Sequence, residues 1–422
     1  DKNYNIYETS NGSASITDNE LGTSVNWTGA EVVIRKNNHS LDRCKITSHS
    51  GNTLTYTSLS TNQTAFPGYG YFIQNDIKTL SVYGEWYHDF SSNRFYMFFG
   101  GIDPASVTIE VATINSLIIN EGYDFLVFDN LQLHGSISHA TTFLNYTSKS
   151  CTIQNSVISF AGQNGINILG ERNTITNSII SDCNQTGIYT VGDYETISGN
   201  IIRNIGVLPG QAMDGGLTTG IHVTNNHCLI KNNTIKNVGY CGITLSSTAD
   251  IITIQNNFIH NVLITLNDGA GIYTAGEGIS RKLDGNIIIN VTGVTEGTPY
   301  PTMYIARGIY LDVNSTNVTV TNNTVANCTE GGYMVHRAYE NQFENNTAFN
   351  NGYGMFFQNT SGSSIRNISL KNNLFIAKSS AQIALKFYSV TDDILLFGTA
   401  DYNYYARPVD DDDVFHTYSP ST

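Results

Sequence analysis

A glycine followed by alternating apolar and variable positions recurs through the second half of the chain, at steps of 22 to 37 residues. The pattern begins at Gly165, Gly187, Gly220, Gly242, Gly271, Gly308, Gly332 and Gly354. About ten residues later comes a second apolar pair followed by Asn-Asn, as in residues 230–233, and a third apolar pair follows at once, as at Ile235. Each unit therefore predicts three short strands separated by Gly or Asn.

Strands this short cannot each bury an apolar face, but stacked copies of one coil can. A coil of about 22 residues with three strands predicts an all-β, right-handed parallel β-helix solenoid of about ten coils. The second residue of each Asn-Asn pair, or of its close variant Gly-Asn, is expected to hydrogen-bond to its equivalent about 4.8 Å away in the next coil. These residues are Asn200, Asn233, Asn257, Asn286, Asn323, Asn346 and Asn373.

The repeat resembles the right-handed β-helix proteins of the pectin-lyase-like superfamily, particularly secreted bacterial carbohydrate-active enzymes, over roughly residues 115–400. That superfamily includes lyases, hydrolases, epimerases, esterases and phage tailspikes, so the resemblance implies a fold and a carbohydrate ligand but leaves the reaction open. The chain has neither the Asp-Asp and Gly-His-Gly motifs of polygalacturonases nor the Arg-x-Pro-x-x-Arg pattern of pectate lyases. The resemblance also implies a secreted or cell-surface protein, extracellular or periplasmic.

The coil period divides the chain into three expected parts. Residues 1–110 lack the period and are expected to form a β-rich elaboration packed on the solenoid, with a hairpin over residues 84–99. Residues 111–400 are expected to form the β-helix and to carry the active-site groove. Residues 401–422 are expected to end the last coil and form an acidic tail around Asp410 to Asp413.

Composition narrows the partners. With 21 Lys and Arg and a net charge of −14 there is no basic stripe for a nucleic acid, and no stretch approaches the roughly 20 apolar residues of a membrane span. The start at Asp1 is expected for a mature or trimmed product. The six Cys are expected to be buried small residues, because Cys151 and Cys228 share a column but lie about 14 Å apart, beyond disulfide reach.

Three insertions lengthen the coils at residues 206–219, 263–270 and 293–307, each just before a glycine-led strand. They are expected to wall one groove beside the outer face of that strand. Period-two alternation predicts two outward rows on this face. The first row is Tyr189, His222, Thr244, Tyr273, Tyr310, Met334 and Phe356, and the second is Val191, Thr224, Ser246, Ala275, Asp312, His336 and Gln358.

Charged residues, only 13% of the chain, gather between residues 268 and 340. Asp268 and Asp312 are the expected catalytic carboxylates of a glycoside hydrolase, with Glu277 as substitute, and His336 is expected to orient one of them or to share in proton transfer. The residues expected to contact substrate are Asp214, His222, Tyr273, Glu277, Arg307, Tyr310 and Arg337.

Two further hypotheses stay open. A polysaccharide lyase would act on a uronate-bearing polymer, and its expected residues are Arg281, Lys282, Arg307, Arg337, Tyr273, Tyr310 and His336. A non-catalytic glycan-binding β-helix would need none of these carboxylates. No cofactor is required by any of the three, although Ca²⁺ is possible, and a monomer with a polysaccharide or oligosaccharide partner is expected.

Overall fold

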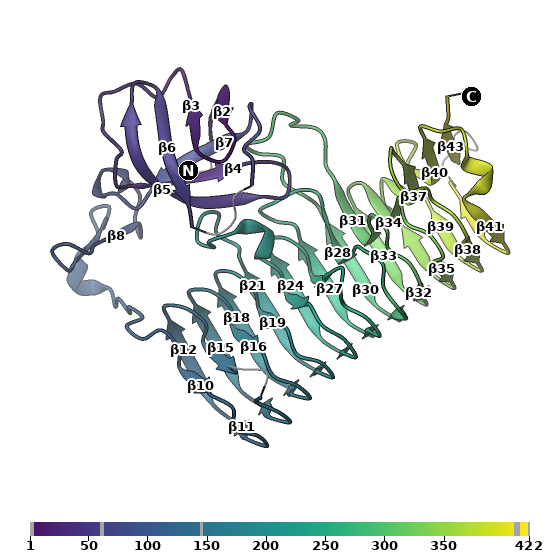
Figure 1. Cartoon of the computed structure of the whole chain (residues 1–422), viewed down its shortest axis with the longest axis horizontal. Coiled ribbons are helices and arrows are strands. Elements are labelled where there is room, and N and C mark those ends of the chain that lie inside the picture. The colour runs from purple at the N-terminus through teal and green to yellow at the C-terminus, as the bar shows by residue number, and fades with distance from the viewer. Residues whose placement is uncertain (1–3, 60–62, 144–146, 409–413, 421–422) are drawn as a thin grey trace. The chain divides into compact units, whose positions relative to one another are not determined.

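The computed structural model describes residues 4–59, 63–143, 147–408 and 414–420, so the acidic run Asp410–Asp413 lies outside the described residues. The chain divides into two compact units (Figure 1). Unit 1 comprises residues 1–113, 209–216 and 295–303, and unit 2 comprises residues 114–208, 217–294 and 304–422. In the described residues no helix is long and apolar enough to cross a membrane.

Unit 2 is a solenoid of three parallel sheets, in which each strand pairs with its equivalent in the next coil. The first sheet contains, in spatial order, β10 (Ile118–Asn120), β13 (Thr141–Phe143), β16 (Ile166–Ile168), β19 (Ile188–Thr190), β22 (Ile221–Val223), β25 (Ile243–Leu245), β28 (Gly269–Thr274), β31 (Ala306–Leu311), β34 (Gly331–His336), β37 (Tyr353–Asn359), β40 (Ile383–Ser389) and β43 (Phe415–Tyr418). The second sheet contains β11 (Val127–Asp129), β14 (Thr152–Gln154), β17 (Thr174–Thr176), β20 (Thr196–Ser198), β23 (Leu229–Lys231), β26 (Thr253–Gln255), β29 (Arg281–Asp284), β32 (Val318–Thr321), β35 (Gln342–Glu344), β38 (Ile368–Lys371) and β41 (Gly398–Asp401). The third sheet contains β12 (Gln132–Ser136), β15 (Val157–Ala161), β18 (Ile179–Cys183), β21 (Ile201–Ile205), β24 (Thr234–Val238), β27 (Phe258–Val262), β30 (Ile287–Val291), β33 (Thr324–Cys328), β36 (Thr347–Phe349), β39 (Leu374–Ile376) and β42 (Tyr404–Ala406). The predicted parallel β-helix is confirmed, with slightly more coils than the expected ten.

The repeated glycine marks the point where neighbouring coils approach most closely. A Cβ on Gly242 would lie 2.6 Å from the carbonyl oxygen of Gly271 and 2.6 Å from a methyl group of Ile259, so no larger residue fits. The residue after each glycine points inward and is fully buried, as Ile243 and Ile272 are. The core of unit 2 is therefore a stack of aliphatic side chains held at a fixed spacing.

The predicted asparagine column is confirmed as a continuous buried ladder. Asn233 donates to Asn257 over 2.9 Å, and Asn257 donates to Asn286 over 3.0 Å. The side chain of Asn257 also accepts from the backbone N–H of Asn233 and donates to the carbonyl of Ile230. The residue before the ladder Asn is in the left-handed region, with φ of 53° at Asn256. The Asn-Asn pair thus combines a residue that tolerates the turn with one that satisfies its buried backbone groups.

All six cysteines are free and buried, as predicted. Glu195 is also inside the solenoid, with no exposed surface, and its Oε1 accepts from the Asn173 amide over 3.3 Å. Its Oε2 is buried without a hydrogen-bond partner. Burial raises the pKa of the Glu195 carboxyl to about 9.

Unit 1 is built on an antiparallel sheet of β1 (Asn5–Ile6), β7 (Gly70–Gln74), β4 (Glu31–Arg35), β5 (Leu41–Ser50), β6 (Thr53–Ser58), β3 (Ser15–Thr17) and β2 (Thr9–Asn11), in that spatial order. The predicted hairpin is present as β8 (Trp86–Asp89) paired with β9 (Arg94–Met97). The described residues also include four short 3-10 helices, η1 (Ile77–Thr79), η2 (Pro104–Ser106), η3 (Gly215–Leu217) and η4 (Ile394–Leu396).

The middle parts of two insertions belong to unit 1. The Arg43 N–H donates to the carbonyl of Met213, and the Arg35 guanidinium donates to the carbonyl of Glu296. The expectation that the insertions at residues 206–219 and 293–307 wall a groove stays a prediction, and their middle parts, residues 209–216 and 295–303, belong to unit 1. These residues supply backbone carbonyls to N–H donors of unit 1.

We predict that Asn257→Ala lowers the free energy of unfolding by about 3 kcal/mol, because it leaves several buried donors and acceptors of the ladder without partners. The control is Gln255→Ala on the same coil, where the partly exposed side chain should cost at most about 0.5 kcal/mol. Urea unfolding of both variants measures the difference. Equal losses would contradict a stabilising role of the buried ladder.

We also predict a pH-dependent stability that Glu195 causes. Its folded pKa lies above the unfolded value of about 4.3, so stability is full below pH 4 and falls by up to about 1.36 kcal/mol per pH unit as the pH rises towards 9. Glu195→Gln should therefore match the wild type near pH 4 and melt at a higher temperature at pH 8. Glu344→Gln, at a partly exposed carboxylate on β35, should not change the slope; a wild-type slope that survives Glu195→Gln would exclude this explanation.

Candidate functional site

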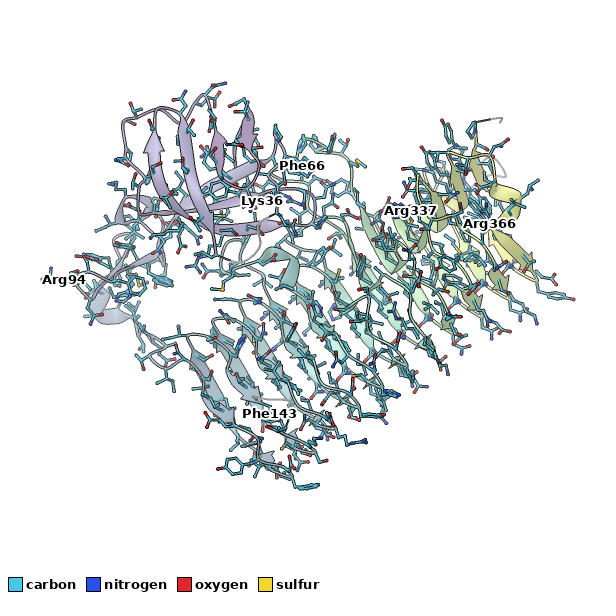
Figure 2. The ribbon with its side chains drawn as sticks, in the orientation of Figure 1. Lys36, Phe66, Arg94, Phe143, Arg337 and Arg366 are labelled. Carbon is cyan, nitrogen blue, oxygen red and sulfur yellow. The ribbon has the colours of Figure 1, made fainter. Side chains whose placement is uncertain are left out.

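The outer face of the first sheet carries two rows of side chains, and Arg337, which directly follows His336 of the second row, is labelled in Figure 2. The register confirms the first row, which runs through Tyr189, His222, Thr244, Tyr273, Tyr310, Met334 and Phe356. In the second row His336 pairs with Gln358, and Asp312 follows the end of β31 beside His336. The sequence period therefore places side chains from neighbouring coils next to one another on one surface.

Three members of the first row are buried, although they point away from the core. Tyr310 is 5% exposed, Met334 0% and Phe356 5%. Side chains that lie three residues earlier on the same strands cover two of them. The Arg307 guanidinium lies 4.3 Å from the centre of the Tyr310 ring, and the Tyr353 ring lies 5.2 Å from Phe356. The expectation of solvent-facing side chains is wrong at these three positions, where the outer face has its own small apolar cluster.

Asp312 is the centre of a hydrogen-bonded group. Its Oδ2 accepts from the Tyr273 hydroxyl over 2.8 Å, and its Oδ1 lies 2.7 Å from Nδ1 of His336. The other ring nitrogen of His336 is 3.0 Å from the Thr360 hydroxyl, and the Tyr310 hydroxyl is 3.4 Å from Nδ1. The imidazole is thus fixed on both sides, and the carboxylate is fixed by donors from three neighbouring strands.

The electrostatics keep the Asp312 carboxyl ionised. Burial opposes its charge, but hydrogen bonds from His336, from the Val313 backbone and from the two tyrosines outweigh burial and lower the pKa of Asp312 below its ordinary value. Burial and the Asp312 charge together raise the pKa of Tyr273, so its phenol stays protonated. The arrangement presents a constrained carboxylate at neutral pH.

A second charged group lies at the other end of the same strands. Arg307 Nη1 lies 2.8 Å from Asp268 Oδ1, and Arg307 Nε lies 2.5 Å from Glu330 Oε2. Because one planar guanidinium contacts both carboxylates, the two contacting oxygens are no more than roughly 8 Å apart. The Asp268 side chain is 32% exposed, against 16% for Glu330 and 5% for Arg307.

Burial and the neighbouring charges shift the pKa values of Glu330 and Arg307. Burial raises the pKa of Glu330, Arg307 acts against this, and the negative charge of Asp268 adds to it. Burial opposes the Arg307 charge, but Glu330, Tyr310 and Asp268 hold the pKa of the guanidinium above its usual value. Asp268 and Glu330 therefore form a coupled pair that shares a permanent cation.

Glu330 is the functional candidate that the sequence reasoning missed. It stands directly before Gly331-Gly332, just as Asp268 stands directly before Gly269 and the repeat glycine Gly271. A charged residue at that place, in a chain with so few charges, was an available signal. Spacing along the sequence alone does not show that both carboxylates meet Arg307 across two strand pairs.

Tyr273 and Tyr310 lie between the two charged groups. Burial is the main cause of the raised pKa of both phenols, and the charges of both Asp312 and Asp268 raise it further. The two rings pack edge to face with centres 5.3 Å apart. We name the set of Asp268, Tyr273, Arg307, Tyr310, Asp312, Glu330 and His336 the tyrosine site.

Several predicted substrate contacts are not members of the tyrosine site. Asp214 belongs to unit 1, where it is buried and accepts from the Gly216 N–H. His222 pairs with Ser246 over 3.2 Å, and burial lowers its pKa to about 4, so it is neutral. Glu277 is exposed and accepts from the Tyr339 hydroxyl. The partly exposed Arg337 follows His336 with φ of 52° and its Nη2 is packed against Gly362.

Two residues expected to take part in a lyase reaction make structural contacts instead. Arg281 has no exposed surface and donates to the carbonyls of Ala249, Ala275 and Ser247, whose dipoles stabilise its charge inside the solenoid. Lys282 lies on the second sheet and pairs with Asp284 over 3.1 Å. The expected roles of both in binding a uronate are wrong, because one is buried and the other is on a different face.

Within residues 4–59, 63–143, 147–408 and 414–420, no group of three or more His, Cys, Asp or Glu side chains is arranged to hold a metal ion. The steps that the tyrosine site can perform are those of its carboxyls, phenols, imidazole and guanidinium.

Comparison with solved structures gives several matches to the fold. A structure described as a glycoside hydrolase matches with a TM-score of 0.64 and 14% identity, over 88% of this chain and 74% of that one. An alginate lyase from Paenibacillus sp. str. FPU-7 matches with a TM-score of 0.43 and 14% identity, over 68% of this chain and 98% of that one. A tailspike protein of E. coli bacteriophage HK620, in complex with a pentasaccharide, matches with a TM-score of 0.47 and 9% identity, over 69% and 57%. At these identities the likeness concerns the fold alone.

Sequence comparison with curated proteins gives no match. The family described as "Right handed beta helix region" matches residues 115–208 and 219–390, which is more than half of the chain. These ranges cover nearly all strands of the three parallel sheets, so sequence and structure agree: the chain belongs to the right-handed β-helix family.

Proposed function

We propose that the protein is a glycoside hydrolase that cleaves a poly- or oligosaccharide at the tyrosine site. The observation that carries this proposal is the placement of two carboxylates at opposite ends of one surface: Asp312 contacts Tyr273, and Asp268 contacts Arg307, which covers Tyr310. Glycosidic bond hydrolysis needs one carboxyl group on each side of the scissile bond. The structural likeness to a protein described as a glycoside hydrolase is consistent with this proposal.

The surroundings suggest different roles for the two carboxyls. Asp312 has the lowered pKa and is the ionised group, so it acts as nucleophile or as the base that activates water. Asp268 is more exposed than Glu330, and we assign it the role of the acid that protonates the leaving oxygen. His336 positions Asp312.

The reaction balances with water as the only co-substrate. The bond between the anomeric carbon and the leaving oxygen breaks, and the protonated Asp268 carboxyl gives its proton to that oxygen. Water supplies the hydroxyl group of the new reducing end. The proton left by the water restores the acid. The Tyr273 phenol gives its single O–H to Asp312, and its oxygen can accept a hydrogen bond from a sugar hydroxyl without a change of charge.

A lyase mechanism has less support from the same residues. It needs a cation to neutralise a uronate carboxylate and a base for the adjacent C–H proton. Arg281 is buried against carbonyls and Arg307 is already shared by two carboxylates. Both site tyrosines have raised pKa values, chiefly through burial, so neither is a ready base.

We predict that Asp312→Asn and Asp268→Asn each lower kcat/KM by at least about 100-fold, because each removes a proton-transfer or nucleophilic group. Asp401→Asn, an exposed carboxylate at the end of β41, is the matched control and should keep full activity. Reducing ends and the absorbance of unsaturated products are followed together on neutral and uronate-bearing polysaccharides. Unsaturated products would mean a lyase, and full activity in both site variants would exclude the assignment.

A second prediction concerns pH. His336 makes the largest contribution that lowers the Asp312 pKa, so His336→Ala should raise that pKa. The acid limb of the kcat/KM profile should then move to higher pH. The variant should lose less activity at pH values above this limb than at pH values within it. His260→Ala, on the third sheet, is the control. An unchanged acid limb would show that His336 does not position the ionised carboxylate.

A further inference from the structure

The two outward rows continue past the tyrosine site towards the last coil. In the second row Gln358 pairs with Tyr388, and Tyr388 pairs with Tyr418. In the first row Phe356 pairs with Lys386. Lys386 and Tyr388 are on β40, three strands beyond Asp312 at β31, which is about 14 Å at the spacing of parallel strands. A glycan that follows the coils would reach this place with a residue a few units from the scissile bond.

The second row ends in a stacked aromatic pair. The rings of Tyr388 and Tyr418 are 4.8 Å apart and nearly parallel, at 10°. Tyr418 is 51% exposed and Tyr388 is partly exposed. Flat phenol faces with accessible hydroxyl groups suit the apolar face of a sugar ring and its polar edge.

Lys386 places a cation beside this pair. Its Nζ lies 4.3 Å from the centre of the Tyr353 ring and 4.6 Å from that of Phe356, and it donates to the Tyr353 hydroxyl over 2.9 Å. In the described chain no Asp or Glu oxygen lies within 4.0 Å of this ammonium group. The rings orient the cation, but they do not neutralise it, and two of its three N–H donors remain available.

The same cation lies within electrostatic reach of the acid pair. Burial raises the pKa of Glu330, and the Lys386 charge acts in the opposite direction. The positive charge of Lys386 attracts an anionic group on the substrate. The net charge of −14 makes long-range steering of a polyanion unfavourable, so discrimination would come from this local contact.

We propose that Lys386, with the stacked pair Tyr388 and Tyr418, forms a subsite for a carboxylate-bearing sugar residue, so that the substrate is an acidic glycan. The inference rests on the proposed function for the position of the scissile bond. The sugar ring lies on the tyrosine pair, and its carboxylate forms a charge-assisted hydrogen bond with the Lys386 ammonium group.

The test uses the full chain with Asp312→Asn, so that binding is measured without cleavage. The probes are oligosaccharides of galacturonic, glucuronic, mannuronic and guluronic acid, each with a matched compound whose carboxyl groups have been reduced to alcohols. Calorimetry should show binding of at least one acidic probe, at least about tenfold weaker binding of its reduced partner, and weakening with added salt.

Lys386→Met in the same background should remove the preference for the acidic probe and leave affinity for its reduced partner within about twofold. Tyr388→Ala should weaken binding of both members of the pair. Lys371→Met, on the second sheet, is the matched control for loss of a surface cation and should change neither. Melting temperatures of all variants show that they fold.

Outcomes for the subsite and for the catalytic proposal are separable. Binding of reduced or neutral glycans only, or an acidic preference that survives Lys386→Met, overturns the subsite whether or not Asp312 is catalytic. Conversely, a Lys386-dependent acidic preference in a protein whose Asp268 and Asp312 variants retain full activity supports the subsite and overturns the catalytic assignment.

Discussion

Parallel backbone hydrogen bonds between successive coils place each strand residue beside its equivalent in the next coil. The positions of the side chains on these strands follow from this register. Glycine stands where two coils come too close for a Cβ, as at Gly242. Asparagine stands where a buried turn would otherwise leave backbone groups unpaired, as at Asn257. A shift of one residue would turn the aliphatic stack outward, so the ladder and the glycines fix the fold together.

The tyrosine site uses the same register for a different purpose. The strand spacing that stacks Ile272 on Ile309 in the core stacks Tyr273 on Tyr310 outside it. Asp312 and His336 then meet because they extend adjacent strands, and Arg307 meets Asp268 and Glu330 because it lies between their coils. A solenoid can thus bring together residues of adjacent coils that lie 24 or 39 positions apart in the sequence.

The fold was predictable from the sequence because its signals repeat. The glycine step, the second Asn of each pair and the inward isoleucines each report the same coil many times over. The outward rows were predictable for the same reason. The burial of side chains on the outer face was not predictable, because it depends on the conformation of long side chains such as Arg307. The sequence pattern does not show that conformation. Arg281 illustrates the same limit. Its place in a cluster of charged residues suggested a role in ligand binding, but at the start of β29 it is buried against backbone carbonyls.

The central claim is that a glycan is cleaved over Tyr273 and Tyr310, between Asp268 and Asp312. A crystal structure of the Asp312→Asn variant with a bound oligosaccharide tests it most directly. The account predicts the anomeric carbon of one sugar above the two tyrosine rings, with the Asp268 carboxyl within hydrogen-bond distance of the leaving oxygen and the substituted side chain at position 312 on the opposite side of that carbon. A saccharide bound on another face of the solenoid, or with its glycosidic bonds beyond reach of both positions, would contradict the account.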